Sequence, residues 1–115
     1  MLEIAVKAAD SKKAQNIVAL DVRKISFLAD YFVICQASNE RQINAIVDEV
    51  VEQEEKNQVE IKRIEGKDSK KWILIDLGDV VVHVFQDSER EFYNLEKLWS
   101  DAPSVDLDGW LKDGL

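Results

Sequence analysis

The stretch WILIDLGDVVVHVF, from Trp72 to Phe85, decides the fold because it predicts a β-hairpin with two different faces. Gly78 and Asp79 separate two strand-like runs, and a two-residue turn that contains glycine fixes the register of a hairpin. That register makes one face wholly aliphatic, with Leu77 opposite Val80, Ile75 opposite Val82 and Ile73 opposite Val84. We expect this face to be core.

The other face of the predicted hairpin is aromatic and polar. It pairs Trp72 with Phe85, Leu74 with His83, and Asp76 with Val81. Tryptophan, histidine and aspartate each carry a polar group, and a mixed surface of this kind suits a partner better than a sealed core. We therefore expect this face to be a contact surface.

Hydrophobic spacing on either side of the hairpin predicts an α/β fold, in which helices pack on a mixed sheet. The predicted helices are residues 2–13, 40–55 and 89–100, and the further strands are residues 16–22, 31–37 and 59–64. Ser38 and Asn39 supply capping side chains for the second helix, and Ser88 with Glu91 predicts a capping box for the last. We expect the last helix to close over the aliphatic face of the hairpin.

The sequence predicts one domain over residues 1–102, followed by an acidic, partly apolar C-terminal tail over residues 103–115. The tail contains the only proline of the chain and two of its four glycines. Four of its side chains are too apolar for an inert linker: Val105, Leu107, Trp110 and Leu111. We expect them to dock on this molecule or on another one.

Composition narrows the class of partner. Twenty-three acidic and fifteen basic residues give a formal net charge of −8, which repels phosphate backbones and membrane surfaces. We therefore expect a neutral or basic protein partner, with no membrane and no sequence-specific nucleic-acid binding. One cysteine excludes an internal disulfide, and the N-terminus resembles neither a signal peptide nor a membrane span, so we expect a cytoplasmic protein.

Candidate chemistry is sparse, and we expect no metal, no cofactor and no catalytic residue. The glycines at 66, 78, 109 and 114 match neither a P-loop nor a dinucleotide fingerprint. Asp76 and Asp79 form a possible carboxylate pair, but aspartate in a turn is common for conformational reasons. His83 lacks a recognisable nucleophile beside it, so we interpret it as a surface or interface residue.

Two further groups have simple structural interpretations. Cys35 lies in an apolar strand, where a buried and unreactive thiol is the expected state. The acidic run on the second predicted helix is interpreted as its solvated face; it comprises Asp48, Glu49, Glu52, Glu54 and Glu55.

Three long strings resemble the ribosomal silencing factor family, also called the RsfS or Iojap family. They are SFLADYFVICQASNERQINAI (26–46), KKWILIDLGDVVVHVF (70–85) and REFYNLEKLW (90–99). The resemblance implies a nucleotidyltransferase-like fold without the catalytic residues. It also implies a translational repressor that binds the large ribosomal subunit through ribosomal protein number fourteen and sterically blocks joining of the small subunit.

The resemblance further implies a homodimer when the protein is free, and it centres the partner contact on the hairpin. The implied contact residues are Trp72, Leu74, Asp76 and His83, with Asp79 and Phe85 as neighbours, while Tyr93 and Glu96 share the family motif. Two other hypotheses stay open. One is a residual metal-dependent nucleotidyltransferase-like or nucleotide-binding enzyme that uses Asp76 and Asp79, and the other is a dimeric scaffold whose aromatic face binds only itself.

Overall fold

A computed structural model describes residues 1–69 and 71–111, without the side chains of residues 92, 93 and 98. Five strands form one sheet in the order β1-β2-β5-β4-β3, in which β2 and β5 are parallel and the other neighbours antiparallel. The strands are β1 (Gln15–Asp21), β2 (Tyr31–Ala37), β3 (Arg63–Glu65), β4 (Trp72–Asp76) and β5 (Val80–Gln86). The helices are α1 (Leu2–Ser11), α2 (Glu40–Lys56), α3 (Asp87–Tyr93) and α4 (Leu95–Leu98). The predicted mixed sheet with helices packed on it is confirmed.

The hairpin of β4 and β5 has the predicted turn and register. The main-chain N–H of Leu77 donates to the carbonyl of Val80 at 2.9 Å and closes the turn. Gly78 has a φ of +96°, which glycine adopts without strain at the first position of such a turn. Cross-strand partners run from Trp72 with Phe85 to Asp76 with Val81, as the turn requires.

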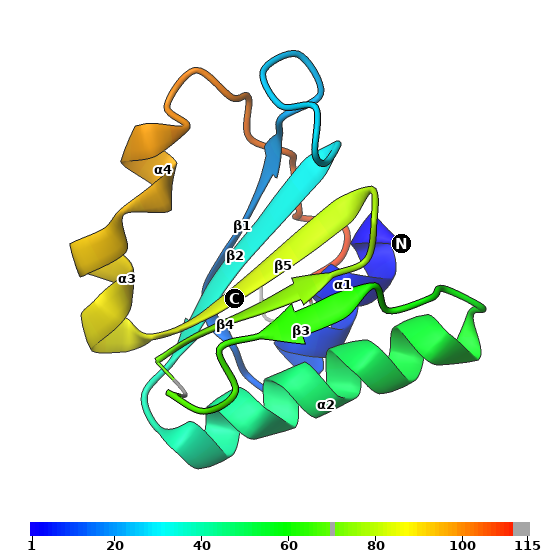
Figure 1. Ribbon diagram of the computed structural model, residues 1–115, viewed down its shortest axis with the longest axis vertical. Coiled ribbons are helices and arrows are strands. Elements are labelled where there is room, and N and C mark those ends of the chain that lie inside the picture. The colour runs from blue at the N-terminus through cyan, green and yellow to red at the C-terminus, as the bar shows by residue number, and fades with distance from the viewer. Residues whose placement is uncertain (70, 112–115) are drawn as a thin grey trace.

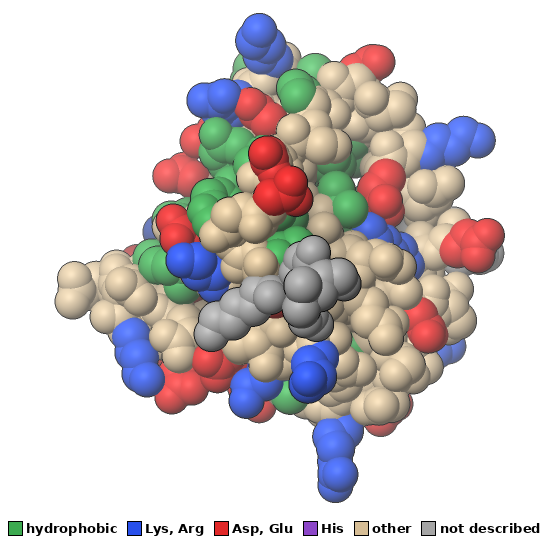
Figure 2. Space-filling model, turned by 180° about the vertical axis from the view of Figure 1, so that it is seen from behind, with side chains coloured by type: hydrophobic (Ala, Val, Ile, Leu, Met, Phe, Trp, Pro, Cys, Tyr) green, Lys and Arg blue, Asp and Glu red, His purple; other side chains and the backbone are tan. Residues whose placement is uncertain are grey.

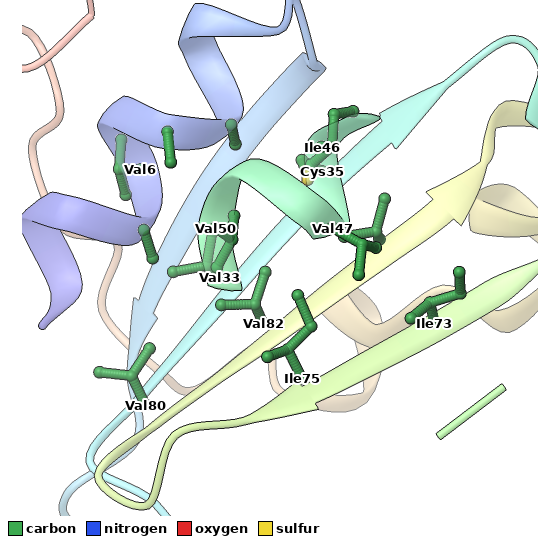
Figure 3. Close-up of a cluster of buried hydrophobic side chains, with 14 of the residues drawn as sticks. Val6, Val33, Cys35, Ile46, Val47, Val50, Ile73, Ile75, Val80 and Val82 are labelled. Atoms are coloured by element: carbon green, nitrogen blue, oxygen red, sulfur yellow. The ribbon is translucent and has the colours of Figure 1, made fainter. Parts of the chain in front are cut away.

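The aliphatic face of the hairpin lies in the main core, beneath α1 and α2. Ile73, Ile75, Val82 and Val84 have no exposed surface. Figure 3 shows α1 and α2 directing Val6, Ile46, Val47 and Val50 toward the sheet residues Val33, Cys35, Ile73, Ile75 and Val82. The apolar residues of the helix predicted over 40–55 therefore lie on the side of α2 that makes this core.

The prediction that the last helix closes over the aliphatic face is wrong. α3 packs on β5 and β2 from the opposite side of the sheet, and Figure 1 shows α3 and α4 apart from α1 and α2. The reason is that β2 adds Phe32 and Ile34 to the aromatic face. The β2 and β5 half of this face is therefore apolar, and it is buried by packing against another segment. Leu95 and Ala102 provide the cover and share a buried cluster with these side chains.

Three local predictions also need correction. The last helix divides at Asn94, which has a φ of +45°, a conformation that asparagine tolerates. The capping box does not form, because α3 already begins at Asp87 and its first turn has no side-chain cap. The strand predicted over residues 59–64 is the three-residue β3, whereas Asn39 caps α2 as predicted, accepting from the N–H of Gln42 at 2.9 Å.

The C-terminal segment docks on this molecule, along the outer edge of β1. The N–H of Asp21 donates to the carbonyl of Pro103, and the N–H of Val105 donates to the carbonyl of Ala19, both at 2.8 Å. Leu107 is buried in the main core. Val105, Trp110 and Leu111 pack against the same core, whereas Pro103, Ser104 and Asp106 are exposed. Residues 112–115 lie outside the described part of the chain. No helix in that described part is long and apolar enough to cross a membrane.

Candidate functional site

One half of the aromatic face of the sheet stays partly open, where β4 and β3 lie beyond the cover of α3. Residues directly opposite in an antiparallel pair share a face, and Glu65 and Arg63 of β3 lie opposite Leu74 and Asp76 of β4. We call the resulting five residues the Trp72 surface: Trp72, Leu74, Asp76, Arg63 and Glu65. The three residues on β4 are half-buried and the two on β3 are exposed.

The indole of Trp72 is held from below by two side chains of β5. Its Nε1–H donates to Nδ1 of His83 at 3.1 Å. Its ring stacks on Phe85, with the centroids 5.0 Å apart and the planes inclined by 24°. The Trp72 side chain therefore has a defined orientation, while part of it remains accessible to a partner.

His83 and Phe85 are buried, so the surface position predicted for His83 is wrong, and the partner contact predicted for both residues stays a prediction. Phe85 has no exposed surface and His83 keeps only 5%. Phe32 of β2 packs edge-on against the imidazole, with the ring centroids 5.1 Å apart. Burial lowers the pKa of His83 to about 4, so the ring is neutral near neutral pH. Both side chains support Trp72 from beneath.

The two aspartates near the turn have structural partners. Oδ1 of Asp76 accepts the main-chain N–H of Gly78 at 2.9 Å, and its Oδ2 lies 3.5 Å from Nε of Arg63. Asp79 is exposed, and its main-chain carbonyl accepts the N–H groups of Asp30 and Tyr31. Within residues 1–69 and 71–111, no group of three or more His, Cys, Asp and Glu residues is placed to hold a metal ion.

The sequence interpretation missed Arg63 and Glu65 as members of the surface. Nε of Arg63 lies 3.0 Å from Oε2 of Glu65, so this arginine is shared between Glu65 and Asp76. The charges on either side of Ile64 were the signal, since alternation of polar and apolar residues marks a half-buried strand. The longer strand predicted over residues 59–64 obscured this alternation.

Arg90 fixes the cover of the aromatic face. It is buried and donates to the main-chain carbonyl of Asn16, to Oε1 of Gln36 at 3.3 Å, and to Oε1 of Glu96 at 3.0 Å. Glu96 therefore has a structural partner within the motif, whereas the side chain of Tyr93 lies outside the described residues.

The buried position predicted for Cys35 is confirmed, and burial raises the pKa of its thiol to about 12.

Glu54 is an exception to the predicted solvated face of α2. Its side chain has no exposed surface, and neither carboxylate oxygen has a hydrogen-bond partner in the described part of the chain. Desolvation raises the pKa of Glu54 to about 7. The rest of the acidic run is exposed or half-buried, as predicted.

We expect Glu54→Gln to remove a pH dependence of stability. A raised pKa means that the folded chain binds this proton more tightly than the unfolded chain, so the free energy of unfolding falls as pH rises from about 4.5 to about 7. Glutamine cannot ionise, and at about pH 8 the variant should be roughly 1–3 kcal/mol more stable than the parent. Urea unfolding at about pH 5 and about pH 8 measures the difference. Glu55→Gln, at an exposed neighbour, is the matched control, and an equal change in both variants would contradict the assignment.

Comparisons with known proteins match most of this chain to proteins of one family. The sequence model of the family described as ribosomal silencing factor during starvation matches residues 1–114. A protein of Halalkalibacterium halodurans named ribosomal silencing factor RsfS is 52% identical over 109 residues, which cover 95% of this chain and 93% of that protein. One of the same name from Bacillus subtilis is 52% identical over 108 residues, covering 94% and 92%. A crystal structure of a Bacillus halodurans protein has a TM-score of 0.82 at 50% identity, covering 92% of this chain and 96% of that one.

Proposed function

The chain belongs to the ribosomal silencing factor family, and from this premise we propose that it represses translation in the bacterial cytoplasm by binding the large ribosomal subunit. The proposed contact is ribosomal protein number fourteen, and the proposed effect is a steric block to joining of the small subunit. The mechanism needs no catalysis, because occupation of a surface is sufficient.

The observation that carries the proposal is the Trp72 surface. Interfaces take much of their binding energy from a few residues, among which tryptophan is enriched. Trp72 is half-buried, oriented by His83 and Phe85, and bordered by the apolar Leu74. Such a side chain offers a large apolar area at a small cost in conformational entropy, which is what a docking anchor requires.

Charge favours a basic protein over bare RNA as the direct partner. The net charge of −8 repels a phosphate backbone, and it steers the chain toward a positively charged protein. On the side of the molecule seen in Figure 2, Lys and Arg side chains are scattered among Asp and Glu and do not gather into one basic patch. These features support a ribosomal protein as the contact within an assembly that is mostly RNA.

The proposal is tested by sedimentation with purified large subunits. We expect the protein to co-sediment with large subunits and not with small ones. It should also reduce the yield of joined ribosomes when both subunits are mixed. Absence of co-sedimentation, or undiminished joining at saturating protein, would reject the proposed function.

We also propose that the free protein is a homodimer. Sedimentation velocity without ribosomes measures the oligomeric state, and the same experiment on Trp72→Ala shows whether the Trp72 surface is the dimer interface. If the protein is a scaffold that uses this face only to bind itself, Trp72→Ala should be monomeric. The parent protein should then not bind the large subunit.

A further inference from the structure

His83 lies beneath the Trp72 surface and is buried although only part of its hydrogen-bonding capacity is used. Nδ1 accepts the indole N–H of Trp72 at 3.1 Å, whereas Nε2 has no hydrogen-bond partner among the residues that the structure describes. A buried polar atom without a partner costs stability. The imidazole lies near the rings of Phe32 and Phe85, with centroids 5.1 and 6.4 Å away, and an aliphatic side chain would suit such surroundings better. The fold alone therefore does not account for histidine here.

The hydrogen bond with Trp72 determines the state of the imidazole. Because Nδ1 accepts, the neutral ring carries its proton on Nε2. Burial keeps the pKa of His83 near 4, so the lone pair on Nδ1 is available throughout the neutral range. The one polar atom of the Trp72 side chain is thereby engaged inside the protein.

We propose that His83 is a positioning residue: it holds Trp72 by the indole N–H, so that a partner meets the ring of Trp72 and not its hydrogen-bond donor. This inference rests on the proposed function of the Trp72 surface. A ring that is already fixed loses little rotational freedom on binding, which lowers the cost of association.

The arrangement also defines the chemistry of the partner group. Because its N–H already donates to His83, Trp72 does not donate to an oxygen acceptor of the partner. Its ring can still attract a cation and pack against the hydrocarbon part of a long side chain. Glu65 lines the same pocket as Trp72 and Leu74. Together with Asp76 it gives the surface two carboxylates against the one guanidinium of Arg63, so the surface carries a net negative charge. The matching group is a lysine or arginine side chain that lies across the indole.

Two substitutions distinguish the hydrogen-bond acceptor of His83 from the space that its ring fills. Asparagine places Oδ1 close to the position of Nδ1 and keeps an acceptor for Trp72, whereas leucine fills the space without one. We expect His83→Asn to bind large subunits within about threefold of the parent. For His83→Leu, which stays folded, we expect a loss of about tenfold, the size of one net hydrogen bond.

The indole N–H resonance of Trp72 supplies a readout that does not depend on ribosomes. It is assigned by its disappearance in Trp72→Phe. We expect the signal to keep its position and its protection from water exchange in His83→Asn, and to lose both in His83→Leu. If leucine fails to fold, His83→Met gives the same comparison with a more adaptable apolar side chain.

The outcomes distinguish this inference from the function on which it rests. Equal binding by His83→Leu and the parent, or equal losses in the asparagine and leucine variants, would overturn the positioning role. If the parent itself does not bind large subunits, the proposed function fails. In that case an unchanged indole resonance in His83→Leu would reject the positioning role as well.

Discussion

Replacing Trp72 with alanine is expected to abolish most binding to the large ribosomal subunit while the chain stays folded. The side chain is half-buried and packs against the buried cluster on the opposite side of the sheet, so its removal leaves the main core under α1 and α2 intact. A central tryptophan anchor contributes about 2 kcal/mol or more, which corresponds to a loss of roughly thirtyfold or more in affinity. Co-sedimentation over a range of protein concentrations measures the loss, and circular dichroism with urea unfolding verifies the fold.

The control for Trp72→Ala is the loss of an exposed aromatic residue elsewhere. Phe27 is fully exposed in the loop between β1 and β2 and does not belong to the Trp72 surface. Phe27→Ala should bind large subunits as the parent does. The reverse pattern, with Phe27→Ala defective and Trp72→Ala intact, would place the contact on that loop and reject the present assignment.

The hairpin was predictable because its determinants are local. A two-residue turn at Gly78 and Asp79 fixes which residues face each other, and the alternation of side chains then divides the faces. The strand Tyr31–Ala37 and the cap at Asn39 were likewise predicted from neighbouring residues alone. Each of these features depends on side chains a few positions apart in the sequence.

The cover of each face was not predictable in the same way, because it depends on contacts between distant segments. The sequence placed His83 and Phe85 correctly on the face of Trp72 but gave no indication that Phe32 would pack over the imidazole. Glu54 was misassigned for the same reason, since the helical pattern of α2 does not reveal which of its polar positions other segments bury. The prediction was therefore correct in the strand and face of these residues and wrong in the exposure of His83.

Replacing Gly66 with alanine is expected to destabilise the protein by about 2–4 kcal/mol and to displace Trp72, since both backbone strain and overpacking oppose the new methyl group. Gly66 has a φ of +89°, and a Cβ built on it would lie 2.1 Å from the main-chain carbonyl oxygen of Trp72. Because that obstacle is backbone, relief requires movement of the start of β4, which carries the proposed anchor. We therefore expect Gly66→Ala to lose affinity for large subunits as well as stability.

Substitutions at two other glycines distinguish backbone strain from overpacking as the cause of this effect. Gly78 has a φ of +96°, but a Cβ there would meet only Cε of Lys62 at 3.6 Å, so Gly78→Ala should cost about 1 kcal/mol from backbone strain alone. Gly109 has open space and no positive φ, so Gly109→Ala should change stability by about 0.5 kcal/mol or less. The urea midpoint should therefore be highest for Gly109→Ala, lower for Gly78→Ala and lowest for Gly66→Ala. Equal effects at Gly66 and Gly78 would mean that β4 yields freely, and the close approach of Gly66 would then have no part in placing Trp72.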